Sequence, residues 1–326
     1  MHYVAFDEYG PPAVLHVAHE PPPVPGATEV LVEVEAAGIS RADVMQRQGN
    51  YPPPRGASPI LGLEVAGTIS ATGADVSRWK RGDRVCALTN GGGYAQYVVV
   101  PEGQVLPIPQ GWSAIEAATL PENAFTVYDN LVTRARLKRG ESVLVHGGTS
   151  GIGSTAIMFA LALGATPYAT AGSEAKRHAA LRFGAKAAID YRTSDFVAEI
   201  QRLTSGAGVD VVLDIVGGDY VARDLDCLAL DGRVVCIATQ RGRVAEIDLG
   251  RLLAKRATIL GSSLRPRTAA QKAAIARELE QHIWPLLARR DPIVPIIDAV
   301  FPFDRAAEAH ARMEAGAHTG KLVLTP

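Results

Sequence analysis

The stretch VLVHGGTSGIGSTA (residues 143–156) decides the fold class of this 326-residue chain. A β-branched apolar run ends in a glycine-rich turn that opens into a helix-like segment, and this context favours a dinucleotide-binding loop. Gly148 and Gly153 occupy the outer positions of the G-x-G-x-x-G pattern, but Ser150 stands in place of the middle glycine. The motif is incomplete, so the rest of the chain must decide between a phosphate-binding loop and an ordinary strand-to-helix turn.

Strand-type runs alternate with helix-length segments on both sides of this loop from about residue 121 onward. The runs are SVLVHGG, TPYATAG, AAIDYR, DVVLDIVGG, GRVVCIATQ and ATILGSS, and helix-like segments such as STAIMFALALG and SEAKRHAALRFG separate them. Such alternation predicts a doubly wound parallel sheet. We therefore predict an α/β cofactor-binding domain over residues 122–265.

The first third of the chain has a different texture. VLVEVEAAG alternates apolar and charged residues as a half-buried strand does, and LGLEVAGTISATG, DRVCAL and GYAQYVVVP follow with glycine or proline at their ends. After residue 265 a helical stretch leads to strand-like PIVPIIDAVFPF and GKLVLTP. We predict that residues 1–121 and 266–326 form a second, β-rich domain.

The composition is that of an ordinary globular protein. The chain is 47% hydrophobic and carries a net charge of −1, so it offers no basic surface for nucleic acid or an anionic membrane. The start, MHYVAFDEYG, lacks the features of a signal peptide, and the apolar stretch at 156–165 is too short to span a bilayer. The three scattered cysteines fit neither a disulfide framework nor a C-x-x-C metal site. We expect a cytoplasmic protein with three buried thiols.

The glycine loop has the chemistry of a pyrophosphate site. Ser150 keeps the side chain small and adds a hydroxyl that could donate to a phosphate. The helix that begins near Gly151 points free N–H groups and its positive end at the same place. A structural turn remains the alternative, although the βαβ array favours a bound dinucleotide.

The end of the second strand, TAGSEAKR, indicates which dinucleotide. NAD enzymes place an acidic residue on the ribose about 20 residues after the loop, and Ala171 stands near that position. Gly172 and Ser173 leave room for a 2′-phosphate, and Lys176 and Arg177 supply positive charge. Glu174 is compatible with either cofactor, and Lys176 as a solvated helix residue is the competing interpretation. The pattern favours NADPH.

The whole chain resembles the medium-chain dehydrogenase/reductase superfamily, specifically its zinc-independent quinone oxidoreductases. The resemblance rests on ADVMQRQGNYPPPRGAS, ILGLEVAG, RGDRV, GGGYAQYVVVPEG, the glycine loop, CLALDGR and GKLVL. Within that family it is similar to the tumour-suppressor-inducible NADPH:quinone oxidoreductase branch. The resemblance implies a GroES-like catalytic domain beside a Rossmann cofactor domain.

Zinc-dependent members of the superfamily hold their catalytic metal with a cysteine, a histidine in a G-H-E motif and a second cysteine. Here Ser40 stands at the first place, Leu63 replaces the histidine, and Glu122 lies near the third. An alkyl side chain cannot bind zinc, and the four-cysteine structural lobe is missing. The resemblance therefore implies no metal, which suits an acceptor that accepts a hydride without a Lewis acid.

The resemblance also implies residue roles. Tyr191 borders the adenosine phosphate, Lys321 lies against the diphosphate, and Ser40 and Thr126 lie near the nicotinamide, which Leu264 contacts through its backbone. The cofactor-binding residues so predicted are Gly148, Ser150, Gly151, Ile152, Gly153, Gly172, Ser173, Lys176, Tyr191, Leu264 and Lys321.

The acceptor side offers one candidate, Tyr51 in GNYPPPRG. Its phenol could stack on a quinone or donate to its oxygen, or it could only pack the loop. Ser40, Tyr51 and Thr126 are thus the predicted catalytic residues, and His146 is predicted to be a satisfied neutral core residue. We expect a homodimer, because ATILGSS would otherwise leave an exposed apolar edge strand.

Together these features predict an NADPH-dependent quinone reductase. An NADPH-dependent enoyl or 2-alkenal reductase is the alternative on the same fold. A third possibility is a low-turnover NADPH-binding protein, of the kind that crystallin or RNA-associated relatives suggest by analogy.

Overall fold

The computed structural model describes residues 1–326, which divide into two compact units. Unit 1 comprises Met1–Phe125, Leu264–Arg290 and Val294–Pro326, and unit 2 comprises Thr126–Ser263 and Asp291–Ile293. The sequence pattern predicts the two main boundaries at residues 121–122 and 265–266, a few residues away from these. Each unit has its own sheet and its own core.

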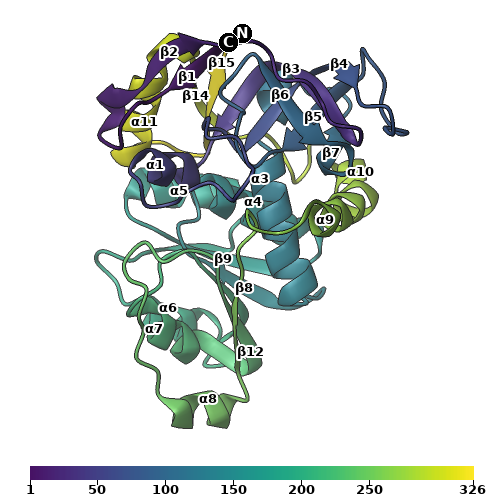
Figure 1. Cartoon of the computed structure of the whole chain (residues 1–326). Helices are drawn as coiled ribbons and strands as arrows, with labels where there is room; N and C mark the ends of the chain where they lie inside the picture. The colour runs from purple at the N-terminus through teal and green to yellow at the C-terminus, as the bar shows by residue number, and fades with distance from the viewer. The chain divides into compact units, whose positions relative to one another are not determined.

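Unit 2 is built on a six-stranded sheet in the order β10-β9-β8-β11-β12-β13, in which every neighbouring pair is parallel (Figure 1). The strands are β8 (Ser142–Val145), β9 (Thr166–Ala171), β10 (Ala187–Asp190), β11 (Val209–Asp214), β12 (Leu228–Cys236) and β13 (Thr258–Gly261). All six predicted strands are present, and the doubly wound parallel sheet is confirmed.

The order of the strands reverses at β8, because the chain runs outward to β9 and β10 and then returns to β11 beside β8. In open sheets of this kind, ligands bind beyond the carboxyl ends of the strands at such a point. The glycine loop directly follows β8, so the topology places it at the binding edge of the sheet.

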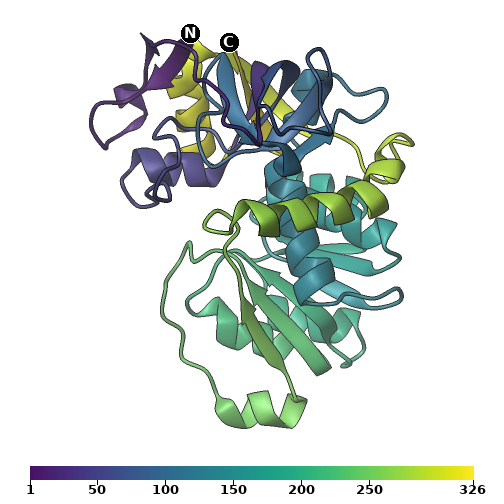
Figure 2. The same ribbon diagram turned by 45° about the vertical axis from the view of Figure 1, so that its right-hand side comes forward.

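The helices of unit 2 are α4 (Gly151–Ala162), α5 (Glu174–Arg182), α6 (Phe196–Leu203), α7 (Tyr220–Cys227) and α8 (Leu249–Lys255). Four of them begin at a serine or aspartate whose side chain accepts a backbone N–H, namely Ser150, Ser173, Asp195 and Asp248. Figure 2 shows the chain leaving β12 in a long loop and returning through α8 to β13.

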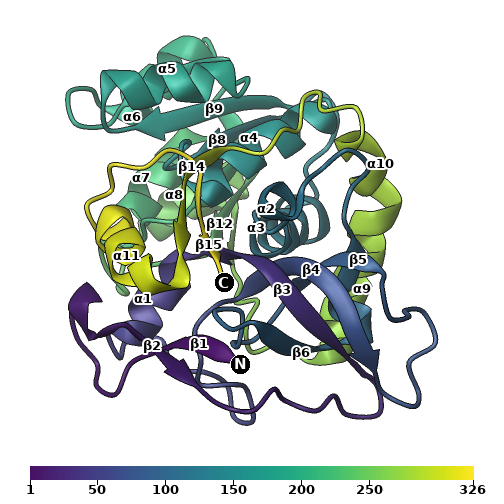
Figure 3. The same ribbon diagram turned by 90° about the horizontal axis from the view of Figure 1, so that it is seen from above.

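Unit 1 contains a seven-stranded sheet and a separate hairpin of β1 (His2–Ala5) and β2 (His16–His19). The sheet runs β14-β15-β3-β4-β5-β7, with β6 also paired to β3 (Figure 3). Its strands are β3 (Glu29–Ile39), β4 (Glu64–Thr72), β5 (Arg84–Leu88), β6 (Tyr97–Pro101), β7 (Val105–Pro107), β14 (Ile297–Pro302) and β15 (Lys321–Thr325). Because β15 pairs with β3, the predicted return of the tail to the first module is confirmed.

The remaining helices include α3, in which the chain passes from unit 1 to unit 2, and η3, which belongs to unit 2. They are α1 (Arg41–Arg47), α2 (Ala114–Ala117), α3 (Pro121–Val127), the π-helical segment η3 (Tyr128–Arg134), α9 (Ala269–His282), α10 (Trp284–Leu287) and α11 (Ala306–Glu314). Short 3₁₀ turns lie at η1 (Pro12–Val14), η2 (Glu102–Gln104) and η4 (Phe303–Arg305).

Two global expectations have outcomes here. No helix combines the length and the apolar character that crossing a membrane requires. All three cysteines are free thiols, but only Cys86 and Cys227 are buried. Cys236, at the end of β12, is partly exposed, so the expectation of three buried thiols is wrong for this residue.

Candidate cofactor and acceptor sites

The glycine loop uses each of its outer glycines for close packing. Gly147 has a φ of +66°, which a residue with a side chain rarely adopts. A Cβ on Gly148 would lie 2.7 Å from the Cβ of Ala169, and one on Gly153 would lie 2.2 Å from the carbonyl oxygen of Gly147. The first and last glycines therefore allow the tight turn and the contact between helix and strand that the motif requires.

The N-terminus of α4 presents free backbone donors. Its first i to i−4 bond runs from Ser154 N–H to the Ser150 carbonyl (2.9 Å). The N–H groups of Gly151 and Ile152 lie before that bond and have no acceptor in the chain. Both residues are partly exposed. Two aligned donors at the positive end of a twelve-residue helix fit a diphosphate.

The hydroxyl of Ser150 has a different role from the predicted one. It accepts the N–H of Gly153 (3.0 Å) and donates to the Gly147 carbonyl (2.9 Å). Its proton is therefore used inside the loop, and the expectation that it donates to a phosphate is wrong for this conformation. Ser150 instead caps the helix and closes the turn.

The ends of β9 and β10 meet at Gly172. A Cβ at this position would lie 2.6 Å from the hydroxyl oxygen of Tyr191 and 3.1 Å from Nε of Arg192. Ser173 begins α5 by accepting the N–H of Lys176 (3.3 Å). The structure thus brings Gly172, Ser173, Lys176 and Tyr191 to one end of the sheet, beside Arg192.

Arg192 was missed by sequence reasoning. It is exposed, and the signal that could have found it is its place directly after Tyr191 in DYR. Its neighbour Asp190 faces Arg177 at 3.9 Å, while Glu174 is exposed in the first turn of α5. The end of β9 itself carries no carboxylate, since Ala171 is its last residue. The space beside Gly172 is filled by Tyr191 and Arg192, and the hydroxyl groups and two cationic side chains gathered there fit a 2′-phosphate.

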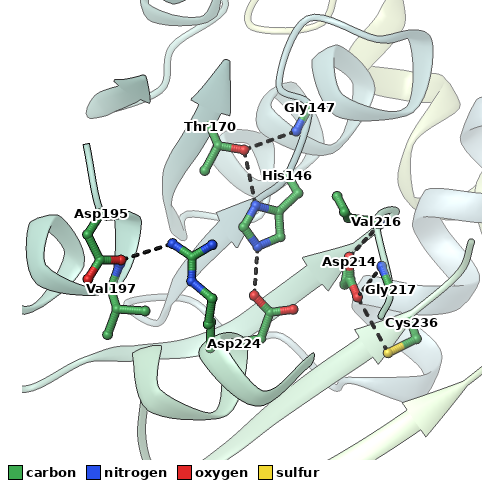
Figure 4. A network of polar contacts seen from close by, with 11 residues as sticks. His146, Gly147, Thr170, Asp195, Val197, Asp214, Val216, Gly217, Asp224 and Cys236 are labelled. Atoms are coloured by element: carbon green, nitrogen blue, oxygen red, sulfur yellow. Dashed lines mark hydrogen bonds and ion pairs between the residues drawn. The ribbon is translucent and has the colours of Figure 1, made fainter. Parts of the chain in front are cut away.

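His146 lies at the end of β8 directly before the loop, and it is fully buried. Its Nδ1 lies 3.0 Å from Thr170 Oγ1 and its Nε2 lies 2.7 Å from Asp224 Oδ1 (Figure 4). Both ring nitrogens have partners, as predicted for a satisfied core residue. Burial raises the pKa of Asp224, and the neighbouring His146 opposes that rise.

In unit 1, the structure brings Ser40 and Lys321 together. Nζ of Lys321 lies 2.5 Å from Glu64 Oε1, 2.7 Å from the carbonyl oxygen of Ile39 and 3.3 Å from Ser40 Oγ. The other carboxylate oxygen of Glu64 accepts the N–H of Glu122 (2.9 Å). The predicted contact of Lys321 with a diphosphate thus has a competitor inside its own unit.

The residues at the zinc-ligand positions do not fit a metal. Leu63 is a buried alkyl side chain, and Ser40 Oγ faces the Lys321 ammonium group. No group of three or more histidine, cysteine or carboxylate side chains is placed to hold a metal ion. The side chains at these positions therefore do not form a donor set for zinc.

Tyr51 lies against Arg265, the second residue that sequence reasoning missed. The guanidinium carbon of Arg265 is 5.2 Å from the centre of the Tyr51 ring. Nη2 donates to Gln46 Oε1 (2.6 Å) and to the Asn90 carbonyl (2.8 Å), and Nη1 lies 3.4 Å from the Tyr51 carbonyl oxygen. Arg265 therefore ties α1 to two loops. A single buried arginine in SSLRPR leaves no periodic or motif signal.

Lys272 lies behind Arg265 and is fully buried. Nζ donates to Asn90 Oδ1 and to the carbonyl oxygen of Arg265. Burial lowers the pKa of Lys272 to about 8, and the positive charges of Arg265 and Arg267 add to that effect. This part of unit 1 therefore holds two buried cationic side chains, and Arg265 is the one that lies against Tyr51.

Thr126 and Leu264, the other predicted nicotinamide contacts, flank the boundary between the units. Thr126 is 9% exposed, and its carbonyl accepts the side-chain amide of Asn130 (2.8 Å). Leu264 is partly buried, and its carbonyl accepts the N–H of Arg267 (3.1 Å). Their predicted roles stay predictions.

Comparison with known proteins gives the family. Residues 26–110 match the alcohol dehydrogenase GroES-like domain, and residues 151–279 match the zinc-binding dehydrogenase family. The positions of Ser40, Leu63 and Glu122 lie outside the second match, so that description does not concern them.

Relatives match over very different shares of their length. Human quinone oxidoreductase is 31% identical over 333 residues, which cover 99% of this chain and 97% of that protein. A phenolphthiocerol/phthiocerol polyketide synthase polypeptide of Mycobacterium tuberculosis is 36% identical over 303 residues. That match covers 92% of this chain but only 14% of the synthase polypeptide, so this chain spans a small part of that relative's length.

Solved structures agree in fold over the whole chain. Escherichia coli quinone oxidoreductase complexed with NADPH matches with a TM-score of 0.86 and 31% identity, covering 100% of both chains. The CurK enoyl reductase matches with a TM-score of 0.86 and 29% identity, covering 99% of this chain and 98% of that chain. The chain therefore belongs to the medium-chain dehydrogenase/reductase superfamily of NAD(P)H-dependent oxidoreductases, and it is quinone oxidoreductase-like.

Proposed function

We propose that this protein is an NADPH-dependent quinone reductase that uses no metal, of the tumour-suppressor-inducible branch. The observation that carries the cofactor part is the pair of free N–H groups at the start of α4, together with the acid-free end of β9. The quinone part is supported by relatives named for that activity.

The residues of unit 2 would bind and orient the cofactor. Gly151 and Ile152 donate to the diphosphate through their N–H groups, and Ser173, Lys176 and Arg192 surround the 2′-phosphate. Tyr191 covers the adenosine side beside Gly172. When bound, NADPH supplies a hydride from its nicotinamide ring.

The residues of unit 1 would hold and polarise the acceptor. As the hydride arrives, negative charge develops on a quinone oxygen, and a proton donor there lowers the barrier. The Tyr51 phenol is the proposed donor, and Arg265 fixes its ring and loop. Ser40 Oγ is proposed to border the nicotinamide, with Leu264 as a backbone contact, and Thr126 of unit 2 is proposed to border it as well.

The second candidate function is enoyl or 2-alkenal reduction, which the likeness to an enoyl reductase favours. A panel of ortho-quinones, para-quinones and 2-alkenals, each followed by loss of NADPH absorbance, separates the candidates. Quinone turnover at least tenfold faster than alkenal turnover supports the proposal. The reverse order favours the enoyl reductase, and no turnover with any acceptor favours a low-turnover NADPH-binding protein.

The cofactor preference rests on Lys176. One charge-assisted hydrogen bond to the 2′-phosphate contributes about 1.5–3 kcal/mol, or roughly ten- to a hundredfold in affinity. Lys176→Ala should weaken NADPH binding by that factor and leave NADH binding unchanged in a fluorescence titration. Arg182→Ala, in the last turn of the same helix, is the matched control. Equal losses for both cofactors would contradict the assignment.

We further propose that the protein is a homodimer joined through β13, with no nucleic-acid partner. This strand is an edge of the parallel sheet, and the nearby loop and α8 expose Val244, Leu249 and Leu253 at 87%, 65% and 75%. Light scattering at micromolar concentration should give the dimer mass, and Leu253→Lys should reduce it. A monomeric wild-type mass would contradict the proposal.

A further inference from the structure

A carboxylate, an imidazole and a hydroxyl form a buried chain that ends on the glycine loop. Asp224 comes from α7, His146 from the end of β8 and Thr170 from β9 (Figure 4). Thr170 Oγ1 lies 3.0 Å from His146 Nδ1 and accepts the N–H of Gly147 (3.3 Å). The Thr170 carbonyl accepts the N–H of Gly148 (3.0 Å). One residue therefore holds the first two N–H groups of the loop.

The direction of each hydrogen bond in this chain is fixed from the Asp224 end. The Asp224 carboxylate can only accept, so Nε2 of a neutral His146 carries the ring proton and donates to Asp224 Oδ1. Nδ1 is then unprotonated and accepts the Thr170 hydroxyl proton, while a lone pair of Thr170 Oγ1 accepts the Gly147 N–H. The arrangement requires one tautomer of His146, and the carboxylate selects it, as second partners of imidazoles do.

Nucleophilic catalysis is excluded by burial, although the same three groups form the triad of many hydrolases. Thr170 is 1% exposed, and His146 and Asp224 are fully buried. No substrate can reach the hydroxyl. The rings of Phe196 and Tyr220 pack edge-on against His146 and close the chain off on that side.

We infer that Asp224, His146 and Thr170 act as a positioning relay for cofactor binding, because they fix the glycine loop and with it the N-terminus of α4. The inference rests on the proposed dinucleotide site. It assigns the relay to the part of the cofactor that NADPH and NADH share, the diphosphate. The relay should therefore affect both cofactors equally, unlike Lys176.

The test removes the hydroxyl without changing the shape of the strand residue. Thr170→Val keeps the branched side chain and loses the hydrogen bonds, and Thr170→Ser keeps the hydroxyl. Dissociation constants for NADPH and NADH are measured by nicotinamide fluorescence without any acceptor, at a temperature where near-UV circular dichroism shows both variants folded. Thr170→Val should lower the affinity for NADPH and for NADH by the same factor, about three- to tenfold, which is the effect of one lost hydrogen bond. Thr170→Ser should bind both cofactors with dissociation constants within about twofold of wild type.

A spectroscopic signature reports on the relay without cofactor. In protein labelled with ¹⁵N at histidine, with His146→Gln to assign the signals, His146 should show a protonated Nε2 and an unprotonated Nδ1. Asp224→Asn keeps the shape but offers either a donor or an acceptor, so it should give a mixture of tautomers and weaken both cofactors.

Four results would overturn the inference. They are wild-type affinities in Thr170→Val, an equal loss in Thr170→Ser, a loss confined to NADPH, and a wild-type His146 protonated at Nδ1. A wild-type chain that binds neither dinucleotide but shows the expected tautomer would instead overturn the proposed function, and the relay's role in binding with it.

Discussion

Lys321 gives the sharpest test of how the two units divide their work. The family resemblance predicts that this lysine contacts the diphosphate, whereas within unit 1 its ammonium group faces Glu64 at 2.5 Å. Both side chains are buried, at 6% and 0% exposure. Lys321→Met removes the charge but keeps a similar volume, and it leaves the Glu64 carboxylate buried without a counterion.

The expected loss of stability follows from the groups left behind. Removing one partner of a buried ion pair costs about 3–5 kcal/mol, because the other charge is left buried and uncompensated. The lost contacts to the Ile39 carbonyl and Ser40 Oγ are part of that loss. The free energy of unfolding should therefore fall by about 3–5 kcal/mol at pH 7. The double variant Lys321→Met/Glu64→Gln should lose less, because it leaves no buried charge without a counterion.

Urea unfolding followed by tryptophan fluorescence measures this in unit 1 alone, because Trp79, Trp112 and Trp284 all lie there. NADPH affinity is measured in parallel. A Lys321→Met protein that unfolds like wild type at pH 7 but binds NADPH at least tenfold more weakly would refute the reasoning. In that case the ammonium group serves the cofactor and the ion pair with Glu64 contributes little.

Three further predictions concern the loop, the acceptor site and the pH dependence of stability. Gly153→Ala should destabilise the protein by about 1–3 kcal/mol or more and weaken NADPH binding, because the added Cβ would lie 2.2 Å from the Gly147 carbonyl oxygen. Gly261→Ala is the control, because a Cβ at that position has no neighbour within 4 Å; it should change neither the stability nor the NADPH affinity. Tyr51→Phe should slow single-turnover quinone reduction by about three- to tenfold with NADPH affinity unchanged, and Tyr51→Ala should in addition raise the quinone KM; two variants that match wild type would reduce Tyr51 to loop packing. Burial raises the pKa of Asp43 to about 6, so on acidification the folded chain binds this proton before the unfolded chain does. The wild-type protein therefore gains stability from Asp43 as the pH falls from 6 to 4, and Asp43→Asn should lose about 1.4 kcal/mol per pH unit relative to wild type over that interval. A difference in the free energy of urea unfolding that stays constant with pH would contradict this prediction.

The fold of unit 2 could be predicted because its signals are local. Each strand of the parallel sheet is a short apolar run between turn residues, and four of its five helices start at a serine or aspartate cap. Their order along the chain then fixes the topology. In unit 1 the return of the tail to the first module was predicted, but its pairing partner β3 and the pairing of β6 with β3 join strands far apart in sequence and left no local signal.

The candidate site could be predicted in part for the same reason. The loop glycines are neighbours of one another in sequence, and so are Ser173 and Lys176, whose N–H the Ser173 hydroxyl accepts. Thr170, Asp224 and Arg265 act through partners 24, 78 and 175 or more residues away, so their type and position say nothing until the chain is folded. Ser150 is a different case, since the hydroxyl that was predicted to donate to a phosphate donates to the Gly147 carbonyl inside the loop.

The residues around Lys321 finally bear on where an acceptor is polarised. The three segments that hold catalytic zinc in relatives are represented here by Ser40, by Leu63 with its neighbour Glu64, and by Glu122. They still converge in unit 1, but around an ammonium group that faces Ser40 Oγ and Glu64 Oε1, while Glu122 donates its N–H to the other oxygen of Glu64. The Lys321 ammonium group donates to the Ile39 carbonyl and to Ser40 Oγ, and it forms an ion pair with Glu64 Oε1. These contacts engage the ammonium group inside unit 1, which supports the proposal that Tyr51 and its neighbour Arg265 polarise the acceptor.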